Sequence, residues 1–573
     1  MTTQQINWVY TEPDPAQIQI AMGEFNVPEI YARVLVARGI IYRTDGTSFF
    51  NAGHVHTNDP FLMKGMDQAV ELILKEIKAG HPILIFGDYD VDGTTAASML
   101  YLVLIELGAK PSTYIPNRET DGYGLSAKGI DYAELIGASL MITCDCGINA
   151  VEMVDYAHAK NIQVIITDHH VPDRELPGAE AILNPKQVDC PYPFKGLCGG
   201  GVAFKLALAL AERSGYDRNL VWQHADLVAL GTAADIVPII DENRVIVKEG
   251  LKLMRERSKP GLAALWQVSG MAGKDMTVGR LVFGLAPKIN AAGRLGDAGR
   301  SVKLLTTENH YFAVTMAREL VAENERRRRI QEQTVEDAIF QVNAQHDLTR
   351  EKVLVLHSEK WHAGVIGIVA ARIRDLFHRP TAIIAFHDGV GKGSLRSMAD
   401  FDLYAALSAC RSELAGFGGH TVAAGLTVER DNLKAFAKKF NAWADLKLTF
   451  EQLIPRQIVD GDCPLELIDG RFIRFLNSLE PYGPGNRRPV FVSRGVDVIG
   501  TPRLVGDGAD HIKFKVSQGS KSFDVIGFGQ AHHYEKLIVG KPVDIAYIVE
   551  ENSWQGNRQV QLQVKDIKLG ESV

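Results

Sequence analysis

Hydrophobic positions between about residues 81 and 240 fall into short apolar runs that alternate with longer stretches of helical spacing. This alternation is typical of a parallel sheet whose strands are joined by crossover helices. Between the first two runs, the segment GTTAASMLYLVLIELG begins at Gly93, carries apolar residues at helical spacing and closes on Gly108, so it predicts one such helix. The clearest predicted strands are ILIF at 83–86, LMIT at 140–143 and VIIT at 164–167.

Three further patterns occupy the second half of the chain. Residues 308–347 lack proline and glycine, which predicts one or two long helices joining two domains. A smaller α/β module starts at Lys352, passes through the glycine-rich HDGVGKGSLRS and ends near Leu446. After EPYGPGNRRP (480–489) come the alternating segments HIKFKV, SFDVIGF, VDIAYIV and QVQLQV, whose spacing predicts a small barrel such as an OB-fold.

Composition and charge narrow the class of protein only a little. A chain of 573 residues with 46% hydrophobic and 23% charged residues is an ordinary globular protein of several domains. No apolar run approaches the roughly 20 residues that span a bilayer, and the start lacks a signal-peptide pattern, so we expect a cytoplasmic protein. The net charge of −7 gives no global attraction to nucleic acid, so a polyanion would need a local basic groove and metal ions.

Two local features have both a functional and a structural interpretation. Cys144 and Cys146 lie close enough to hold zinc, but no second ligand pair accompanies them, so buried thiols are favoured. The four scattered remaining cysteines fit a reducing compartment. The four arginines at 326–329 fit a DNA contact, although a solvated helix face is the commoner explanation.

Acidic residues follow each of the three predicted strands. Because the carboxyl ends of parallel strands line one crevice, these side chains should converge although they lie far apart in the sequence. A further acid, in GTAADIVPI, sits where a helix breaks before Pro238. The acids and their neighbours are Asp88, Asp90 and Asp92 after the first strand, Asp145 after the second, Asp168, His169 and His170 after the third, and Asp235 at the helix break.

Converging carboxylates need cations. Two carboxylates about 4 Å apart repel by roughly 4 kcal/mol at an effective dielectric of 20, so four or five cannot stay ionised together unaided. Oxygen-rich ligation with one or two imidazoles suits Mn²⁺ or Mg²⁺ better than zinc. Two such ions about 3.5–4 Å apart support in-line phosphoryl displacement, so phosphoester hydrolysis is the predicted reaction.

Each motif alone has a weaker interpretation. A DxD pair can be a loop feature, and His170 can be a hydrogen-bonded histidine without a role in the reaction. DVDGT also looks like the nucleophile motif of haloacid-dehalogenase-type phosphatases, in which Asp90 would be phosphorylated and Asp92 would act as acid. That family's nucleophile directly follows its strand, whereas three residues intervene here. The ordered set of four acidic motifs therefore favours the metal site.

The four motifs FGDYDVDGTTA, CDCG, TDHH and GTAADIVP match, in order, those of the DHH phosphoesterases. GSLRS and GFGGH resemble the DHH-associated domain, and the order of the modules is similar to that of the longer, DNA-degrading members. The resemblance implies an α/β protein with a parallel-sheet catalytic domain, a connecting helix, a smaller α/β substrate-binding domain and a terminal OB-fold. The predicted boundaries are 1–60 for an N-terminal segment, then 61–300, 301–348, 349–450 and 451–573 for these four parts.

The resemblance also implies roles for the acidic residues. Asp145 would bridge two divalent ions, Asp88 and Asp168 would orient ligands or water, and His170 would face the scissile phosphate. Smaller members carry a metal-binding histidine where Phe86 stands here, a departure that Asp88 would partly offset. The metal ligands implied by the match are Asp90, Asp92, Asp145, His169 and Asp235.

Phosphate binding is assigned to loops and glycine-rich turns. Hydroxyls, a guanidinium fork and close backbone amides suit phosphate, although a plain glycine turn would also explain GFGGH. The candidates are Arg118, Arg294, Ser394, Arg396, Ser397, Gly418, Gly419 and His420.

By this resemblance we expect a monomeric exonuclease that degrades single-stranded DNA from a 5′ end during recombination and repair. It would work beside a single-strand-binding protein and a RecQ-type helicase and would not bind a membrane. Aromatic residues of the barrel would stack on bases. Two alternatives stay open: a DHH phosphodiesterase for short oligonucleotides or cyclic dinucleotides, and a scaffold that binds single strands without cleaving them.

Overall fold

The computed structural model describes residues 6–117, 121–122, 124–398, 400–554 and 557–570. They form two compact units. The parallel-sheet unit comprises residues 12–324 and 460–489, and the barrel unit comprises residues 1–11, 325–459 and 490–573. Each unit is described by itself.

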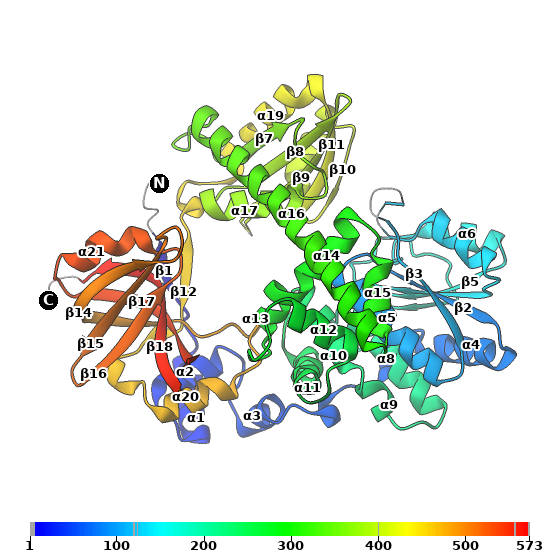
Figure 1. The fold of residues 1–573 in the computed structure, drawn as a ribbon, viewed down its shortest axis with the longest axis horizontal. Coiled ribbons are helices and arrows are strands. Elements are labelled where there is room, and N and C mark those ends of the chain that lie inside the picture. Colours follow the sequence, from blue (N-terminus) through cyan, green and yellow to red (C-terminus); the bar gives the residue numbers. More distant parts are fainter. Residues whose placement is uncertain (1–5, 118–120, 123, 399, 555–556, 571–573) are drawn as a thin grey trace. The chain divides into compact units, whose positions relative to one another are not determined.

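A five-stranded parallel sheet organises the parallel-sheet unit (Figure 1). Its strand order is β3-β2-β4-β5-β6, and every neighbouring pair is parallel. The three predicted strands are confirmed as β2, β4 and β5, and two edge strands flank them. The bounds are β2 Pro82–Gly87, β3 Lys110–Tyr114, β4 Leu140–Cys144, β5 Gln163–Thr167 and β6 Ala181–Leu183.

Helices cover both faces of this sheet, because alternate strand residues are apolar on both sides. Ile83 and Ile85 of β2 face a core with helices α4, α5, α8 and α10, whereas Leu84 and Phe86 face a second core with α6 and α7. The helices are α4 Met66–Ala79, α5 Val91–Glu106, α6 Ala127–Leu135, α7 Val151–Ala159, α8 Gly199–Arg213 and α10 Ala225–Ala234.

Further helices complete the parallel-sheet unit. Short helices from both ends of the sequence meet there, since Tyr31 of α2 stacks on Phe475 of α20 with ring centroids 4.5 Å apart. These elements are α1 Pro15–Phe25, α2 Glu29–Val36, α3 Arg43–Phe50, α9 Asn219–Trp222, α11 Asp241–Arg257, α12 Pro260–Val268, α13 Val278–Arg280, the π-helix η3 Leu281–Leu285, α14 Ala286–Leu295, α15 Gly299–Thr306 and α20 Gly470–Ser478.

A single long helix, α16 His310–Gln345, begins in the parallel-sheet unit and ends in the barrel unit. It confirms the long helix predicted from the absence of proline and glycine. Within the arginine run at 326–329, Arg327 is buried and Arg328 pairs with Glu332. One arginine of the run is therefore a packed residue rather than part of a solvated face.

The smaller α/β module of the barrel unit is a mixed five-stranded sheet between helices, with the order β10-β11-β9-β8-β7. β7 and β8 are parallel and the other pairs are antiparallel. α17 and the end of α16 pack on one face, and α18 and α19 pack on the other. The bounds are β7 Leu354–Ser358, α17 Ile366–Phe377, β8 Thr381–His387, β9 Val390–Arg396, α18 Leu403–Ala409, β10 Gly416–Gly419, β11 Ala423–Glu429 and α19 Leu433–Lys447.

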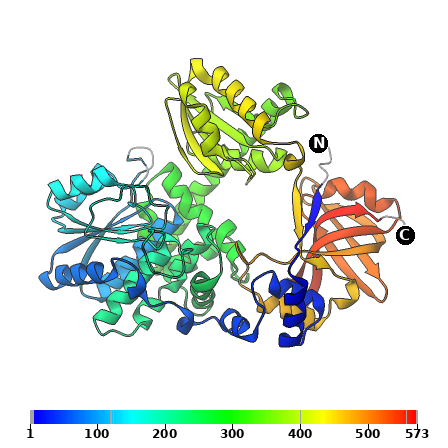
Figure 2. The ribbon, with the colours of Figure 1, turned by 180° about the vertical axis from the view of Figure 1, so that it is seen from behind.

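The C-terminal strands close into a five-stranded barrel, seen from behind in orange and red in Figure 2. The order is β14-β15-β16-β18-β17, and pairing of β14 with β17 closes it. As predicted for HIKFKV, Ile512, Phe514 and Val516 are buried and the two lysines between them are exposed. The bounds are β14 Phe491–Val505, β15 His511–Gln518, β16 Lys521–Gly527, α21 Tyr534–Ile538, β17 Val543–Trp554 and β18 Asn557–Leu569.

The predicted fold class is confirmed, and two features of the chain's path were not foreseen. The first strand, β1 Asn7–Tyr10, pairs in parallel with β12 Arg456–Val459 in the barrel unit. Residues 460–489 group with the parallel-sheet unit, although the prediction assigned them to the barrel domain. The five-part division itself stays a prediction. In the part of the chain that the structure describes, no helix combines the length and apolar character needed to cross a membrane.

Candidate metal centre

Three neighbouring strands of the parallel sheet deliver acids to one edge. Asp88, Asp145 and Asp168 each directly follow the last residue of β2, β4 or β5. Their backbone N–H groups extend the sheet pairing by one residue, which fixes where each side chain starts. The acceptors are the carbonyl oxygens of Cys144 at 3.1 Å, Thr167 at 2.9 Å and Leu183 at 3.0 Å, respectively.

Two helix ends supply the remaining acids. Asp90 is the N-cap of α5, where its side chain accepts from the N–H of Gly93 at 3.0 Å, and Asp92 lies in the first turn. Asp235 caps the C-terminus of α10. The predicted helix break before Pro238 is therefore a cap that directs a carboxylate toward the sheet edge.

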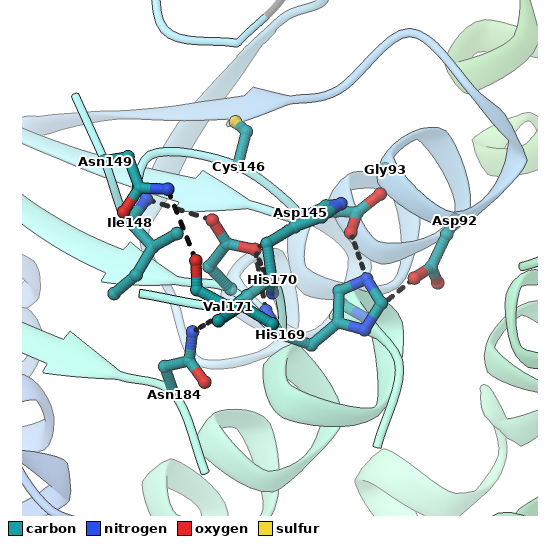
Figure 3. A network of polar contacts seen from close by, with 12 residues as sticks. Asp92, Gly93, Asp145, Cys146, Ile148, Asn149, His169, His170, Val171 and Asn184 are labelled. Carbon is teal, nitrogen blue, oxygen red and sulfur yellow. Dashed lines mark hydrogen bonds and ion pairs between the residues drawn. The ribbon is translucent and has the colours of Figure 1, made fainter. Parts of the chain in front are cut away.

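These side chains form three overlapping groups whose potential ligand atoms lie within 4.8 Å of one another. Nε2 of His169 lies 3.2 Å from Oδ1 of Asp145 and 3.6 Å from Oδ2 of Asp235. Figure 3 shows the His169 ring beside the carboxylate of Asp145. Asp145 is shared by two groups, as a bridging ligand would be. The groups are Asp88, Asp90 and Asp145; Asp92, His169 and Asp235; and Asp145, His169 and His170.

Several buried polar atoms in these groups find no hydrogen-bond partner among the described residues. They are Oδ1 of Asp88, Oδ1 of Asp145, both ring nitrogens of His169 and Oδ2 of Asp235. A buried polar atom without a partner costs about 1–3 kcal/mol, and more when the group is charged. Buried oxygens and an imidazole that lack partners are the donors that Mn²⁺ and Mg²⁺ take, so the residues present fit divalent cations.

Burial and mutual repulsion oppose ionisation of the carboxyl groups. Burial, with the charge of Asp90, raises the pKa of Asp92 to about 6. Burial, with the charges of Asp92 and Asp90, raises the pKa of Asp235 to about 8. Burial also raises the pKa values of Asp88 and Asp145 well above their usual range. Without cations, burial and mutual repulsion disfavour the charged forms of these carboxyl groups, and bound cations would favour them.

The surroundings of the two histidines shift their pKa values in opposite directions. Burial lowers the pKa of His169 to about 3, so this imidazole is neutral, as a metal ligand must be. Burial alone would lower the pKa of His170, but its Nδ1 lies 2.7 Å from Oδ1 of Asp168, and this hydrogen bond and charge raise it instead. Asp168 also accepts from the backbone N–H groups of His169 and Ile148. Asp168 therefore holds the ring of His170 and the backbone of His169; its role in orienting ligands or water stays a prediction.

The backbone at the N-terminus of α8 contacts the acids of the metal centre. The sequence did not predict this contact. The N–H of Gly199 donates to Oδ2 of Asp92 at 2.7 Å, and that of Gly200 donates to Oδ1 at 3.0 Å. A methyl group on Gly199 would lie 2.5 Å from Oδ1 of Asp145, and one on Gly200 would lie 2.9 Å from Oδ1 of Asp92. Three consecutive glycines at 199–201 were the available signal.

Backbone strain is present at two positions of the site. Asp145 has φ of 65° and Ile236, next to Asp235, has φ of 63°. Left-handed backbone costs a non-glycine residue roughly 1–2 kcal/mol. Asp tolerates this region better than a β-branched residue does. Such strain persists where the surrounding structure holds a functional geometry.

Phe86 and the cysteines are buried, and among the cysteines Cys198 has a hydrogen bond with Asp92 of the metal centre. Phe86 is fully buried and stacks with Tyr114, with ring centroids 5.5 Å apart. Asp88, two residues later, joins Asp90 and Asp145 in one of the groups, so it is placed as a ligand as much as an orienting residue. All six cysteines are buried and free, in line with the favoured interpretation.

The predicted phosphate-binding residues fall into separate parts of the chain. Ser394 and Arg396 lie on β9, where Nη1 of Arg396 is 3.2 Å from Oγ of Ser394. Ser397 is buried, whereas Gly418, Gly419 and His420 at the end of β10 are exposed. Arg294 is half-buried on α14, and Arg118 lies outside the described residues. Their binding role stays a prediction.

A parallel sheet with acids and a neutral histidine at its carboxyl edge defines the class of divalent-metal-dependent phosphoesterases. Comparison with known families agrees with this class. Models of the DHH family N-terminal domain, the DHHA1 domain and the RecJ OB domain match residues 82–232, 350–445 and 459–566, respectively.

Known relatives cover most of the chain. The single-stranded-DNA-specific exonuclease RecJ of Bacillus subtilis is 36% identical over 577 residues, covering 100% of this chain and 72% of that protein. RecJ of Escherichia coli is 35% identical over 88% of this chain and 90% of its own length. The crystal structure of Thermus thermophilus RecJ with Mn²⁺ superimposes with a TM-score of 0.85 at 29% identity, covering 100% of this chain and 81% of that chain. The chain belongs to the RecJ family of DHH phosphoesterases.

Proposed function

We propose that the protein is an exonuclease that hydrolyses single-stranded DNA from the 5′ end, in DNA recombination and repair. The observation that carries the proposal is the set of buried carboxylate oxygens and imidazole nitrogens at the sheet edge that have no hydrogen-bond partner among the described residues. The RecJ relatives are named as single-stranded-DNA-specific exonucleases, and two RecJ structures are described as complexes with Mn²⁺ and Mg²⁺.

The metal ligands we assign are Asp90, Asp92, Asp145, His169 and Asp235, together with Asp88; Asp145 belongs to two of the groups and would serve both ions. When bound, such ions stabilise negative charge on the phosphate and lower the pKa of the attacking water. Gly199 and Gly200 hold Asp92 in place through their N–H groups. The hydrogen bond to Asp168 raises the pKa of His170 and so favours its protonated form, which can donate to an oxygen of the scissile phosphate.

Direction of degradation would come from recognition of the terminal phosphate. We assign this to Arg396, Ser394 and Ser397, with the glycine turn at 418–419 and His420, and to the loop arginines Arg118 and Arg294. A guanidinium fork beside a hydroxyl matches the oxygens of a phosphate. Replacing Arg396 with Ala should remove the preference for 5′-phosphorylated over 5′-hydroxyl strands while manganese binding is unchanged; a retained preference would remove this account of direction.

The wider setting follows from the family alone. We expect a monomer in the cytoplasm that works with a single-strand-binding protein and a RecQ-type helicase and does not bind membranes. Of the barrel aromatics, Phe514 and Tyr547 are buried in the core, Phe523 is half-buried and Phe528 is exposed, so Phe523 and Phe528 are candidates for base stacking. The side chain of Trp554 lies outside the described residues.

The direct test compares substrates and one inactive variant. With Mn²⁺, the wild type should release mononucleotides from a long 5′-phosphorylated single strand, faster than from duplex DNA or a dinucleotide. Asp145→Asn should release none while still folding, as judged by circular dichroism. Preference for the dinucleotide would favour a small-substrate phosphodiesterase. Tight binding of the strand without turnover would favour a scaffold.

A further inference from the structure

The residue that follows Asp235 has an unusual backbone conformation for its side chain. Helix α10 ends at Ala234, Asp235 caps it, and Ile236 comes next with φ of 63°. This position after a helix normally holds glycine, which adopts left-handed backbone without a steric penalty. Glycine at this position would therefore stabilise the end of the helix more than isoleucine does.

Packing of Ile236 within the protein does little to offset this backbone strain. Its side chain is 64% exposed, so packing within the protein does not offset the unfavourable backbone. Among the described non-glycine residues with positive φ, it is the β-branched member. The others are Asn26, Asp145, Asn161, Asp241, His378, Asp388 and Ala509.

The same residue directly follows a carboxylate of the metal centre in the chain. Its neighbour Asp235 belongs to the group with Asp92 and His169. Three residues further on, Ile239 is buried and its N–H donates to the carbonyl of Pro484 at 2.6 Å, which anchors the segment. An exposed apolar residue thus directly follows Asp235, a member of a site made of charged groups.

We propose that Ile236 contacts the substrate, packing against the sugar and base of the nucleotide next to the scissile phosphate. The inference rests on the proposed nuclease function and names a residue that binds the apolar part of its substrate. Sugar carbons and base faces occur in every nucleotide, so this contact tolerates any sequence. The cost of the strained backbone is then repaid only when the strand is bound.

The test uses the full-length protein with Mn²⁺ and a 5′-phosphorylated single strand. Ile236→Gly and Ile236→Ala should each raise KM about 10-fold, the loss expected for one partly buried isoleucine side chain. Ile236→Val, which keeps a branched apolar side chain, should stay within about 2-fold of the wild type. Asn26→Gly is the matched control, because Asn26 also follows a helix, α1, with left-handed backbone but is not part of the metal centre; its KM should not change.

Two further readouts separate this role from a structural one. The melting temperature of Ile236→Gly should not fall, because glycine relieves the strain, and its affinity for Mn²⁺ should match the wild type. An unchanged KM in the Gly and Ala variants would overturn the inference. So would a parallel loss of Mn²⁺ affinity, which would show that Ile236 only positions Asp235. A wild type that does not cut the strand would instead overturn the proposed function.

Discussion

Two clusters of buried charge in the parallel-sheet unit differ in how their charges are matched. Around Glu242, the ammonium of Lys205 pairs with the carboxylate, the hydroxyl of Tyr192 donates to it at 2.5 Å, and the N–H of Asn58 donates at 2.7 Å. The ammonium also donates to the carbonyl of Asn58 at 2.8 Å. At the metal centre, carboxylates face one another and several of their buried atoms lack partners among the residues described.

The comparison shows that burial of charge does not by itself mark a functional site. Glu242 is as deeply buried as Asp145, yet an opposite charge and hydrogen bonds satisfy it, so its burial needs no bound ligand. Like charges without partners have no such explanation and imply a ligand of opposite charge. Mutations at the metal centre should therefore lower activity without lowering stability, whereas mutations around Glu242 should lower stability without lowering activity.

The largest effect is expected for Asp92→Asn at the metal centre. Asparagine has one carbonyl oxygen, so it can accept from Gly199 or from Gly200 but not from both, and it removes a charge that the ions need. Activity should fall by more than about 100-fold, which is the largest loss expected when only a supporting partner of a metal ligand is removed. The melting temperature of the metal-free protein should not fall at about pH 8, because the repulsion that is removed offsets the lost hydrogen bond. A fall in both quantities would contradict the contrast.

Lys205→Met should have the opposite pattern. It leaves Glu242 as a buried charge without its cation, which costs about 3–5 kcal/mol of unfolding free energy. The activity per folded molecule should match the wild type, as measured by single-strand degradation normalised to the folded fraction. The double variant Lys205→Met with Glu242→Gln should recover part of the stability. Loss of activity in the folded double variant would show that the two clusters are coupled.

Substitutions at two adjacent glycines of α8 test whether its backbone contributes to metal binding. Gly200→Ala places a methyl group 2.9 Å from Oδ1 of Asp92 and should lower Mn²⁺ affinity about 10- to 100-fold. Gly201→Ala is the matched control, since its methyl group would contact Leu197 at 3.2 Å instead. Calorimetric titration with Mn²⁺ measures both variants. Equal affinities would remove the proposed role of the α8 backbone.

The smallest expected effect is on the pH dependence of stability. The folded-state pKa values of Asp92 and Asp235 are raised to about 6 and about 8. Between the unfolded value near 4 and these values the folded state binds more protons, so the metal-free protein should lose stability as the pH rises from about 4 to about 8. Asp235→Asn should flatten this slope in thermal melts, and Mn²⁺ should oppose it in the wild type. Stability that rises with pH over this range would contradict the assigned pKa shifts.

The sequence predicts the parts of the fold that depend on local pattern. The apolar runs that became β2, β4 and β5 each end in an acid, and parallel-sheet geometry alone predicts that Asp88, Asp145 and Asp168 share an edge. The long helix α16 and the alternation within β15 follow equally from periodicity. The RecJ assignment and the need for divalent cations agree with the comparisons.

Other features depend on contacts between distant segments, which no local pattern contains. The contact of Gly199 with Asp92 arises only when α8 packs beside α5. The pairing of β1 with β12 and the first barrel strand, β14, were missed because neither β1 nor β14 has a simple alternation bounded by turn residues. The left-handed backbone of Ile236 could not be predicted from the sequence, because isoleucine rarely adopts this conformation.

The central claim is that the acids at the sheet edge hold two divalent ions. Anomalous diffraction from crystals grown with Mn²⁺ tests it most directly. We predict two manganese peaks, one among Asp88, Asp90 and Asp145 and the other among Asp92, His169 and Asp235. Manganese peaks only at other positions would contradict the account. So would a metal centre without manganese in crystals of protein that degrades single-stranded DNA in solution with Mn²⁺.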